Sequence, residues 1–190
     1  SRAHHFGLTY DWNINQNLHL KVEPYFQYLF HVPVEEKSSF SVINYEEFYL
    51  DRILVNTGKG RNYGIDITLE QYMKNGFYYM ITGSLFKSKY RGGDNVWRNT
   101  RLDKGYLLNL LAGKEWMVGK LKQNVLSLTG RLYFQGGGRY TPVNKERSQA
   151  EHDIVFDETQ AYSERFSPSI NGDVSVSYTH LRAHETRRHL

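Results

Sequence analysis

The feature that most constrains this chain is strict alternation of apolar and polar residues. In residues 5–14, one set of alternate positions is entirely apolar and consists of Phe6, Leu8, Tyr10, Trp12 and Ile14. Successive side chains of a β-strand point to opposite faces, so this segment predicts a strand with one apolar and one polar face. The same alternation recurs, with a few exceptions, in residues 18–31, 62–70, 77–88, 106–116 and 126–135. The sequence therefore predicts an all-β fold with about six strands.

The connections between these segments alternate between short and long. Short turns are expected near Gln16, Asn75 and Gly119, and Asn75-Gly76 is a hairpin sequence because both residues tolerate positive φ. Long connections are expected over residues 32–58, 91–103 and 136–172. Short turns at one rim and long loops at the other are typical of a bacterial outer-membrane barrel, with periplasmic turns and extracellular loops. We therefore expect an antiparallel transmembrane β-barrel.

Six strands are too few to close a large barrel, so we expect a fragment of a barrel. No run of residues reaches the roughly 18 apolar positions that a transmembrane helix needs. Charges in the middle of the polar stripes, such as Asp66 and Arg131, suit a wet or plugged lumen. The alternative that stays open is a soluble antiparallel sheet whose apolar face covers a core. Aromatic residues at the ends of the apolar stripes favour the membrane, because such rings suit its two interfaces, and they are Trp12, Tyr28, Phe30, Tyr63, Phe77, Trp116 and Phe134.

Charge and composition argue against several classes of function. The formal net charge is +4, but residues 176–190 contribute +2 through three arginines and one glutamate, so we expect no nucleic-acid partner. The chain contains no cysteine, which excludes disulfides and thiolate metal sites. Gly58-Lys59-Gly60-Arg61 lacks the spacing of a phosphate loop, and a turn with a bulge is expected there. No catalytic motif stands in a usable context, so we expect no enzyme, no cofactor and no metal site.

Several separate motifs resemble one family, in order along the chain. They lie in residues 4–34, 38–44, 54–72, 83–116 and 136–143, the last with the sequence GGGRYTPV. Over residues 1–173 the chain resembles the C-terminal β-barrel of TonB-dependent outer-membrane receptors. The resemblance is specific for this superfamily and carries no information about the ligand.

The resemblance implies a multi-pass protein in the outer membrane of a Gram-negative bacterium, with a barrel of about 22 strands. Its partners would be outer-membrane lipid, the TonB system and a bulky solute such as a siderophore, vitamin, glycan or peptide. In this family an N-terminal plug contacts TonB, and no segment of this sequence resembles that plug. Residues 1–175 are expected to form part of the barrel. Residues 176–190 begin with VSYTHLRAHET, which is similar to a translated sequencing adapter, and are expected to be a non-native tail. A seventh strand that begins near Asp173 is therefore expected to be truncated.

The function that the resemblance implies is TonB-coupled uptake of a bulky solute. A passive porin-like barrel, an outer-membrane hydrolase and a soluble sugar-binding β-sheet protein are the rivals. A porin needs a loop folded into its lumen, a hydrolase needs a catalytic cluster at the rim, and a soluble protein stays in water without detergent. Aromatic residues in the long loops can stack on sugars or flat chelates, and the candidate ligand contacts are Tyr45, Tyr49, Trp97, Tyr140 and Tyr162.

Overall fold

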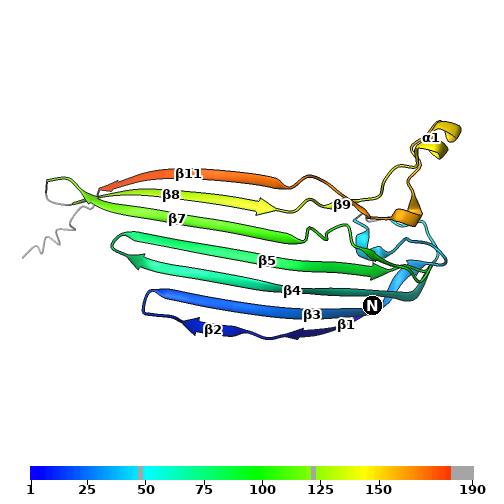
Figure 1. The fold of residues 1–190 in the computed structure, drawn as a ribbon, viewed down its shortest axis with the longest axis horizontal. Helices are drawn as coiled ribbons and strands as arrows, with labels where there is room; N and C mark the ends of the chain where they lie inside the picture. The colour runs from blue at the N-terminus through cyan, green and yellow to red at the C-terminus, as the bar shows by residue number, and fades with distance from the viewer. Residues whose placement is uncertain (47–48, 121–122, 181–190) are drawn as a thin grey trace, which may run out of the picture.

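The computed structural model describes residues 1–46, 49–120 and 123–180, most of which lie in one large antiparallel β-sheet (Figure 1). A short strand, β6 (Trp97–Asn99), adds to β5, while β9 (Arg139–Tyr140) and β10 (Glu164–Arg165) form a separate pair. The all-β prediction is confirmed. The main strands are β1 (Arg2–Gly7), β2 (Tyr10–Asn13), β3 (Leu18–Glu35), β4 (Leu54–Lys74), β5 (Phe77–Arg91), β7 (Tyr106–Val118), β8 (Asn124–Gln135) and β11 (Ser169–His180).

The sheet is open. Its order is β1-β3-β4-β5-β7-β8-β11, and β2 continues β1 along β3. Among the described residues β1 pairs only with β3 and β11 only with β8, so each side of the sheet keeps a free edge (Figure 1). The predicted antiparallel order is therefore confirmed, but the sheet does not close into a barrel. Closure would require more strands, since seven strand positions cannot encircle a large lumen.

The strands are long for a globular protein. β4 has 21 residues and β3 has 18, whereas roughly five or six are usual. The segment predicted as one strand over residues 5–14 is divided into β1 and β2. The reason is Pro24, which accepts a hydrogen bond from the Leu8 N–H at 3.1 Å but has no N–H to return. The pairing register with β3 is the same on both sides of this break.

The first long connection is shorter than predicted, because β3 continues to Glu35 and β4 begins at Leu54. A bulge makes this possible: His31 has a φ of 54°, and the register shifts between Phe30 and Val32. Gly58 lies opposite this bulge, where an added Cβ would come within 2.4 Å of Val34 Cγ1. The predicted bulge near residues 58–61 is therefore confirmed, but the predicted turn is wrong, since these residues belong to β4.

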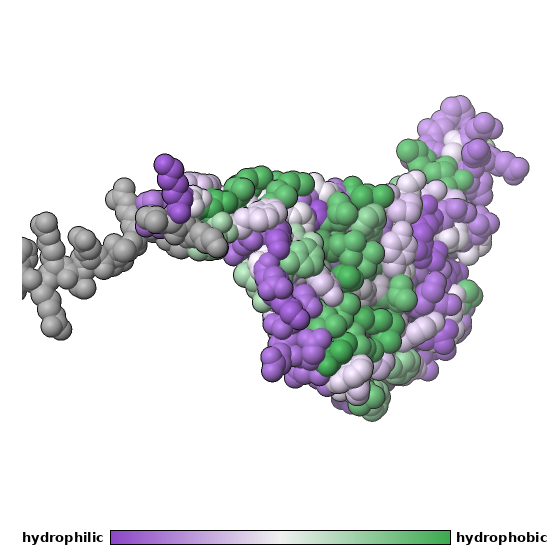
Figure 2. Space-filling model, turned by 60° about the vertical axis from the view of Figure 1, so that its left-hand side comes forward, coloured by the Kyte–Doolittle hydropathy of each residue, from purple (hydrophilic) through white to green (hydrophobic). Residues whose placement is uncertain are grey.

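Cross-strand register gives the sheet two unlike faces. Figure 2 shows a hydrophobic band over the sheet and hydrophilic side chains toward the loop end. On one face, which we call the polar face, Gln27 lies opposite Asn62, Asp66 opposite Ser84, and Arg131 opposite Asp173. The opposite face, called the apolar face, collects apolar side chains from successive strands, among them Phe6, Phe26, Val22, Ile67, Leu69, Ile81, Leu110, Leu132, Leu128 and Val176.

The connections alternate as the sequence predicts. Short turns join β2 to β3, β4 to β5 and β7 to β8 at one end of the sheet (Figure 1). The long connections, residues 36–53, 92–105 and 136–168, meet at the other end, called the loop rim. They contain η1 (Val42–Asn44), α1 (Lys145–Glu151) and η2 (Glu158–Gln160).

Buried side chains are concentrated at the loop rim. In the described part of the chain the buried apolar residues are Val32, Val34, Tyr90 and Ala161. On the apolar face, by contrast, Leu85 is 60% exposed and Val174 is 77% exposed. The apolar face therefore covers no core within the described residues, which the soluble alternative would require. No helix in the described part of the chain is long and apolar enough to span a membrane.

The seventh strand differs from its prediction at both ends. β11 begins at Ser169, four residues before Asp173, and runs to His180. Val176 and Tyr178, from the segment expected to be a non-native tail, pair with Leu128 and Leu126 of β8. The rest of that segment, residues 181–190, lies outside the described residues.

Candidate functional site

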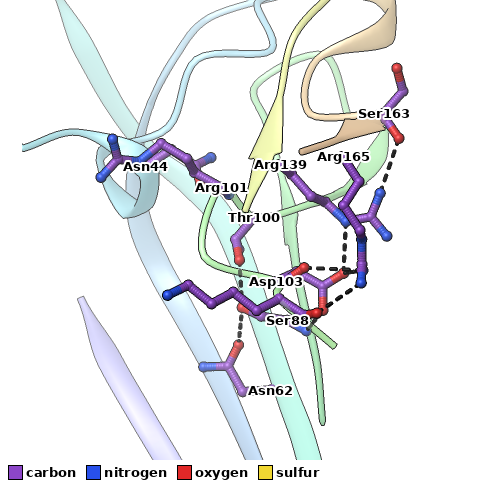
Figure 3. A network of polar contacts seen from close by, with 10 residues as sticks. Asn44, Asn62, Ser88, Thr100, Arg101, Asp103, Arg139, Ser163 and Arg165 are labelled. Atoms are coloured by element: carbon purple, nitrogen blue, oxygen red, sulfur yellow. Dashed lines mark hydrogen bonds and ion pairs between the residues drawn. The ribbon is translucent and has the colours of Figure 1, made fainter. Parts of the chain in front are cut away.

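A buried carboxylate, Asp103, holds the long connections together at the loop rim (Figure 3). It is completely buried and accepts hydrogen bonds from Arg139 Nε at 2.8 Å, the Ser88 backbone N–H at 3.2 Å and an Arg165 guanidinium nitrogen at 3.4 Å. The two arginines come from the connection between β8 and β11, while Asp103 precedes β7. Arg165 also donates to the Lys104 carbonyl at 2.8 Å. One charge cluster therefore fixes two long connections on the end of the sheet.

A chain of polar side chains continues from this cluster onto the polar face. Thr100 Oγ1 donates to Ser88 Oγ at 2.7 Å, Ser88 Oγ to Asn62 Oδ1 at 2.7 Å, and Asn62 Nδ2 to Gln27 Oε1 at 2.8 Å. The Thr100 to Asn62 part is visible in Figure 3. These hydrogen bonds connect one loop to three strands, so the loop rim is one connected structure and not a set of independent loops.

A second clasp closes the connection that contains β6. Arg98 donates to both carboxylate oxygens of Asp94, at 2.9 and 2.6 Å, and the Asp94 carboxylate also accepts from the Val96 N–H at 3.1 Å. Burial on its own would raise the pKa of the Asp94 carboxyl, but the Arg98 and Val96 hydrogen bonds outweigh it and leave the pKa lowered. The hydrogen bond with Asp94 raises the pKa of Arg98. Both groups therefore stay charged at neutral pH.

The loop rim encloses a cavity of about 240 Å³, called the loop cavity. Residues from two connections that are far apart in sequence line it. Ser39, before η1, donates a short hydrogen bond to Glu158, in η2. The other lining residues are Ser38, Phe40, Ser41, Asn44, Tyr45, Arg52, Thr141, Ala161 and Tyr162.

Hydroxyl groups dominate the lining of the loop cavity, with one carboxylate and one guanidinium beside them. Burial raises the pKa of the Tyr162 hydroxyl, Arg101 opposes this effect, and Glu158 adds to it. Because the net shift is upward from an ordinary value of 10.0, this hydroxyl stays protonated at neutral pH and can donate. The Arg52 guanidinium lies over the Phe40 ring, 4.5 Å from its centroid, and also pairs with Glu35 at 2.6 Å. Such a lining can bind a neutral solute that carries several hydroxyl or carbonyl groups.

The structure brings two of the five predicted ligand contacts together. Tyr45 and Tyr162 both line the loop cavity, and Tyr162 meets the buried Tyr90 ring edge to face at 6.1 Å. Tyr49 lies beside them, since the Tyr45 hydroxyl donates to its carbonyl oxygen, and its own side chain is exposed.

The other two predicted contacts lie elsewhere. Tyr140, in β9, contacts the tilted Phe166 ring, with ring centroids 4.5 Å apart, and does not line the loop cavity. Trp97 pairs with Arg91 across β6 and β5 on the apolar face, where the Arg61 guanidinium covers its ring at 4.4 Å. Both remain candidate contacts, but only for a ligand that reaches beyond the loop cavity.

Sequence reasoning missed Glu158, Arg52 and Thr141. A search for aromatic residues could not find them, because polar side chains in loops are usually solvated. Their approach depends on contacts between distant segments, such as the Ser39–Glu158 bond across 119 positions. Within residues 1–46, 49–120 and 123–180 no group of three or more potential metal ligands is present.

Comparison with known proteins gives no relative: no family model, no curated protein and no solved structure matches this chain.

Proposed function

We propose that this chain is part of the wall of an outer-membrane β-barrel, in a receptor that takes up a bulky solute by TonB-coupled transport. The observation that carries the proposal is the uncovered apolar face. Its side chains run across all main strands, and no described element packs on their middle part. An exposed apolar surface of this extent is unfavourable in water and favourable against hydrocarbon.

The order of side chains along β5 supports the same proposal. On the apolar face Phe77 and Tyr79 come first, Ile81, Gly83 and Leu85 follow, and cations begin at Lys87. The distance from Phe77 to Leu85 is about 27 Å along a strand at 3.4 Å per residue. A tilt of roughly 40° reduces this to a height of about 21 Å, close to the apolar band of about 25 Å in outer-membrane barrels.

The loop rim would then face the outside and the short turns would face the periplasm. The loop cavity would make the first contacts with the solute, through Tyr45, Tyr162 and Glu158. The remaining barrel strands and the plug that contacts TonB would be supplied by the parent protein. Polar-face residues such as Asp66 and Arg131 would line the passage.

Tryptophan quenching by brominated phosphatidylcholine tests whether the apolar face enters a bilayer. Trp12 and Trp116 lie on that face near the short turns, opposite Leu20 and Leu126. We expect bromine at the acyl chains to quench both in single-tryptophan variants of the refolded chain, and to quench Trp97 at the loop rim much less. Equal quenching of all three, or none of any, would contradict the membrane proposal and favour a soluble sheet.

Long-read sequencing across the codon for Ser175 tests the receptor proposal separately. We expect the native reading frame to continue into further alternating strands, with a plug-coding region upstream. A genuine end in Arg-Arg-His-Leu without an upstream plug would exclude energised transport and leave a passive barrel or a small β-protein.

A further inference from the structure

The charged side chains on the apolar face are cations, and most of them lie at its loop end. Lys74 and Lys114, which pair with Phe77 near the short turns, are the exceptions. In β1, β2, β4, β5, β7, β8 and β11, and in β3 up to its bulge, every acidic residue belongs to the polar face. The apolar face of β4 and β5 carries five cations at its loop end, called the basic rim: Lys59, Arg61, Lys87, Lys89 and Arg91.

Like charges stand directly opposite each other in the basic rim. Lys59 pairs with Arg91 and Arg61 with Lys89 across β4 and β5. Such pairs destabilise a sheet unless an anion lies between them. The Nε atoms of Arg61 and Arg91 are buried and have no hydrogen-bond partner in the described part of the chain. No carboxylate in the described part of the chain forms an ion pair with these five cations, so the basic rim carries uncompensated positive charge.

A hollow of about 650 Å³ lies at the basic rim, on the side toward β3 and β1. Lys59 and Arg91 line it together with His4, Tyr28 and Phe30. The His4 and Phe30 rings stack at a centroid distance of 5.1 Å and form one wall. Aromatic walls beside cations suit a headgroup that has both a carbon skeleton and a phosphate.

We propose that the basic rim binds the phosphate-bearing headgroup of a lipid in the surrounding leaflet. The inference rests on the proposed function, because it needs the apolar face to meet hydrocarbon. The cations continue the strands of the apolar band directly, with Lys87 two residues after Leu85 and Arg61 two residues before Tyr63. A lipid can therefore place its phosphate on the cations and its acyl chains on the apolar face below. A free anion would gain nothing from that second surface.

Lipid A, a phosphorylated lipid, can be used as the probe in phosphatidylcholine vesicles. Trp97 reports binding, since it lies under Arg61 on the same face, and Trp12→Phe/Trp116→Phe removes the other two tryptophans. We expect lipid A to change Trp97 emission saturably in this background. Adding Lys59→Gln/Lys89→Gln/Arg91→Gln should weaken the apparent affinity at least about tenfold, because each basic residue near an anionic surface contributes strongly to binding.

A matched control separates the basic rim from net charge. Lys120→Gln/Lys145→Gln/Arg147→Gln removes three exposed cations at other places and should leave the affinity within about twofold. Equal weakening by both triple variants would overturn the inference. So would an equal response to inorganic phosphate, which would indicate a site for soluble anions.

Quenching of Trp12 and Trp116 by brominated phosphatidylcholine, in vesicles without lipid A, distinguishes the two proposals. If both are quenched and lipid A has no effect on Trp97, the basic rim inference fails and the membrane proposal stands. If neither is quenched, the membrane proposal fails and the inference fails with it.

Discussion

Asp103 is the single residue on which the loop rim depends most. It is fully buried and neutralises two arginines, and those arginines bring the last long connection onto the sheet. Asp103→Asn would replace an acceptor oxygen by an amide that points donors at Arg139 and Arg165. We expect the loop rim to lose about 3 kcal/mol of stability, the usual effect of removing one partner of a buried ion pair.

Hydrogen–deuterium exchange on the refolded chain in detergent would measure this loss. Amides in residues 100–105 and 139–165 should exchange faster in Asp103→Asn, while those in the middle of β4 and β5 should not change. Asp51→Asn, at an exposed loop position, serves as the control and should match the unsubstituted chain. Unchanged protection in Asp103→Asn would show that the arginines are held by other contacts.

The Asp94–Arg98 clasp makes a separate prediction about pH. Because the folded-state pKa of Asp94 is lower than its ordinary 3.8, the clasp stabilises the loop above that pH and stops doing so as pH falls through the folded pKa. We expect amides around residues 94–98 to lose protection only below about pH 3.8. Asp94→Asn should lack this acid transition and exchange faster already at neutral pH. An identical acid transition in the variant would assign it to another carboxylate.

At the scale of the elements, the β4–β5 hairpin depends on its turn. Asn75 and Gly76 have φ values of 53° and 74°, and Gly76 accepts a hydrogen bond from the Glu115 N–H at 2.7 Å. A Cβ at Gly76 would stand 2.3 Å from the Glu115 carbonyl oxygen. Gly76→Ala should therefore cost about 1–2 kcal/mol of unfolding free energy in a urea titration. Asn75→Gly, which keeps positive φ accessible, should change it by less than about 0.5 kcal/mol.

The same scale shows how far the sequence could predict this fold. Alternation predicted which side chains share a face of each strand, and Asn75-Gly76 predicted a turn. Both signals depend only on residues that are neighbours in the sequence. The break at Pro24 and the bulge at His31 depend on pairing with the neighbouring strand, so the pattern within one strand did not predict them. Closure into a barrel, which the sequence also predicted, would need more strands than the described sheet contains.

The candidate site was less predictable than the strands for a related reason. Their aromatic rings made Tyr45 and Tyr162 candidate ligand contacts, and both line the loop cavity. Trp97 looked equivalent in the sequence, but strand pairing places it beside Arg91 on the apolar face. The carboxylate of Glu158 enters the cavity through a contact with Ser39, and no local pattern encodes a contact over such a separation.

At the scale of the whole molecule, the two faces of the sheet should meet different solvents, and neighbouring residues in the middle of β5 can test this. Ile81 lies on the apolar face between Leu69 and Leu110, and Thr82 lies on the polar face between Thr68 and Asn109. Ile81→Arg should weaken folding into vesicles by about 2–4 kcal/mol, the cost of a cation near the bilayer midplane. Thr82→Arg, with the same added charge one position later, should cost less than about 1 kcal/mol in the same urea titration. Equal costs would mean that both faces contact the same medium, which a wall between lipid and a polar passage does not allow.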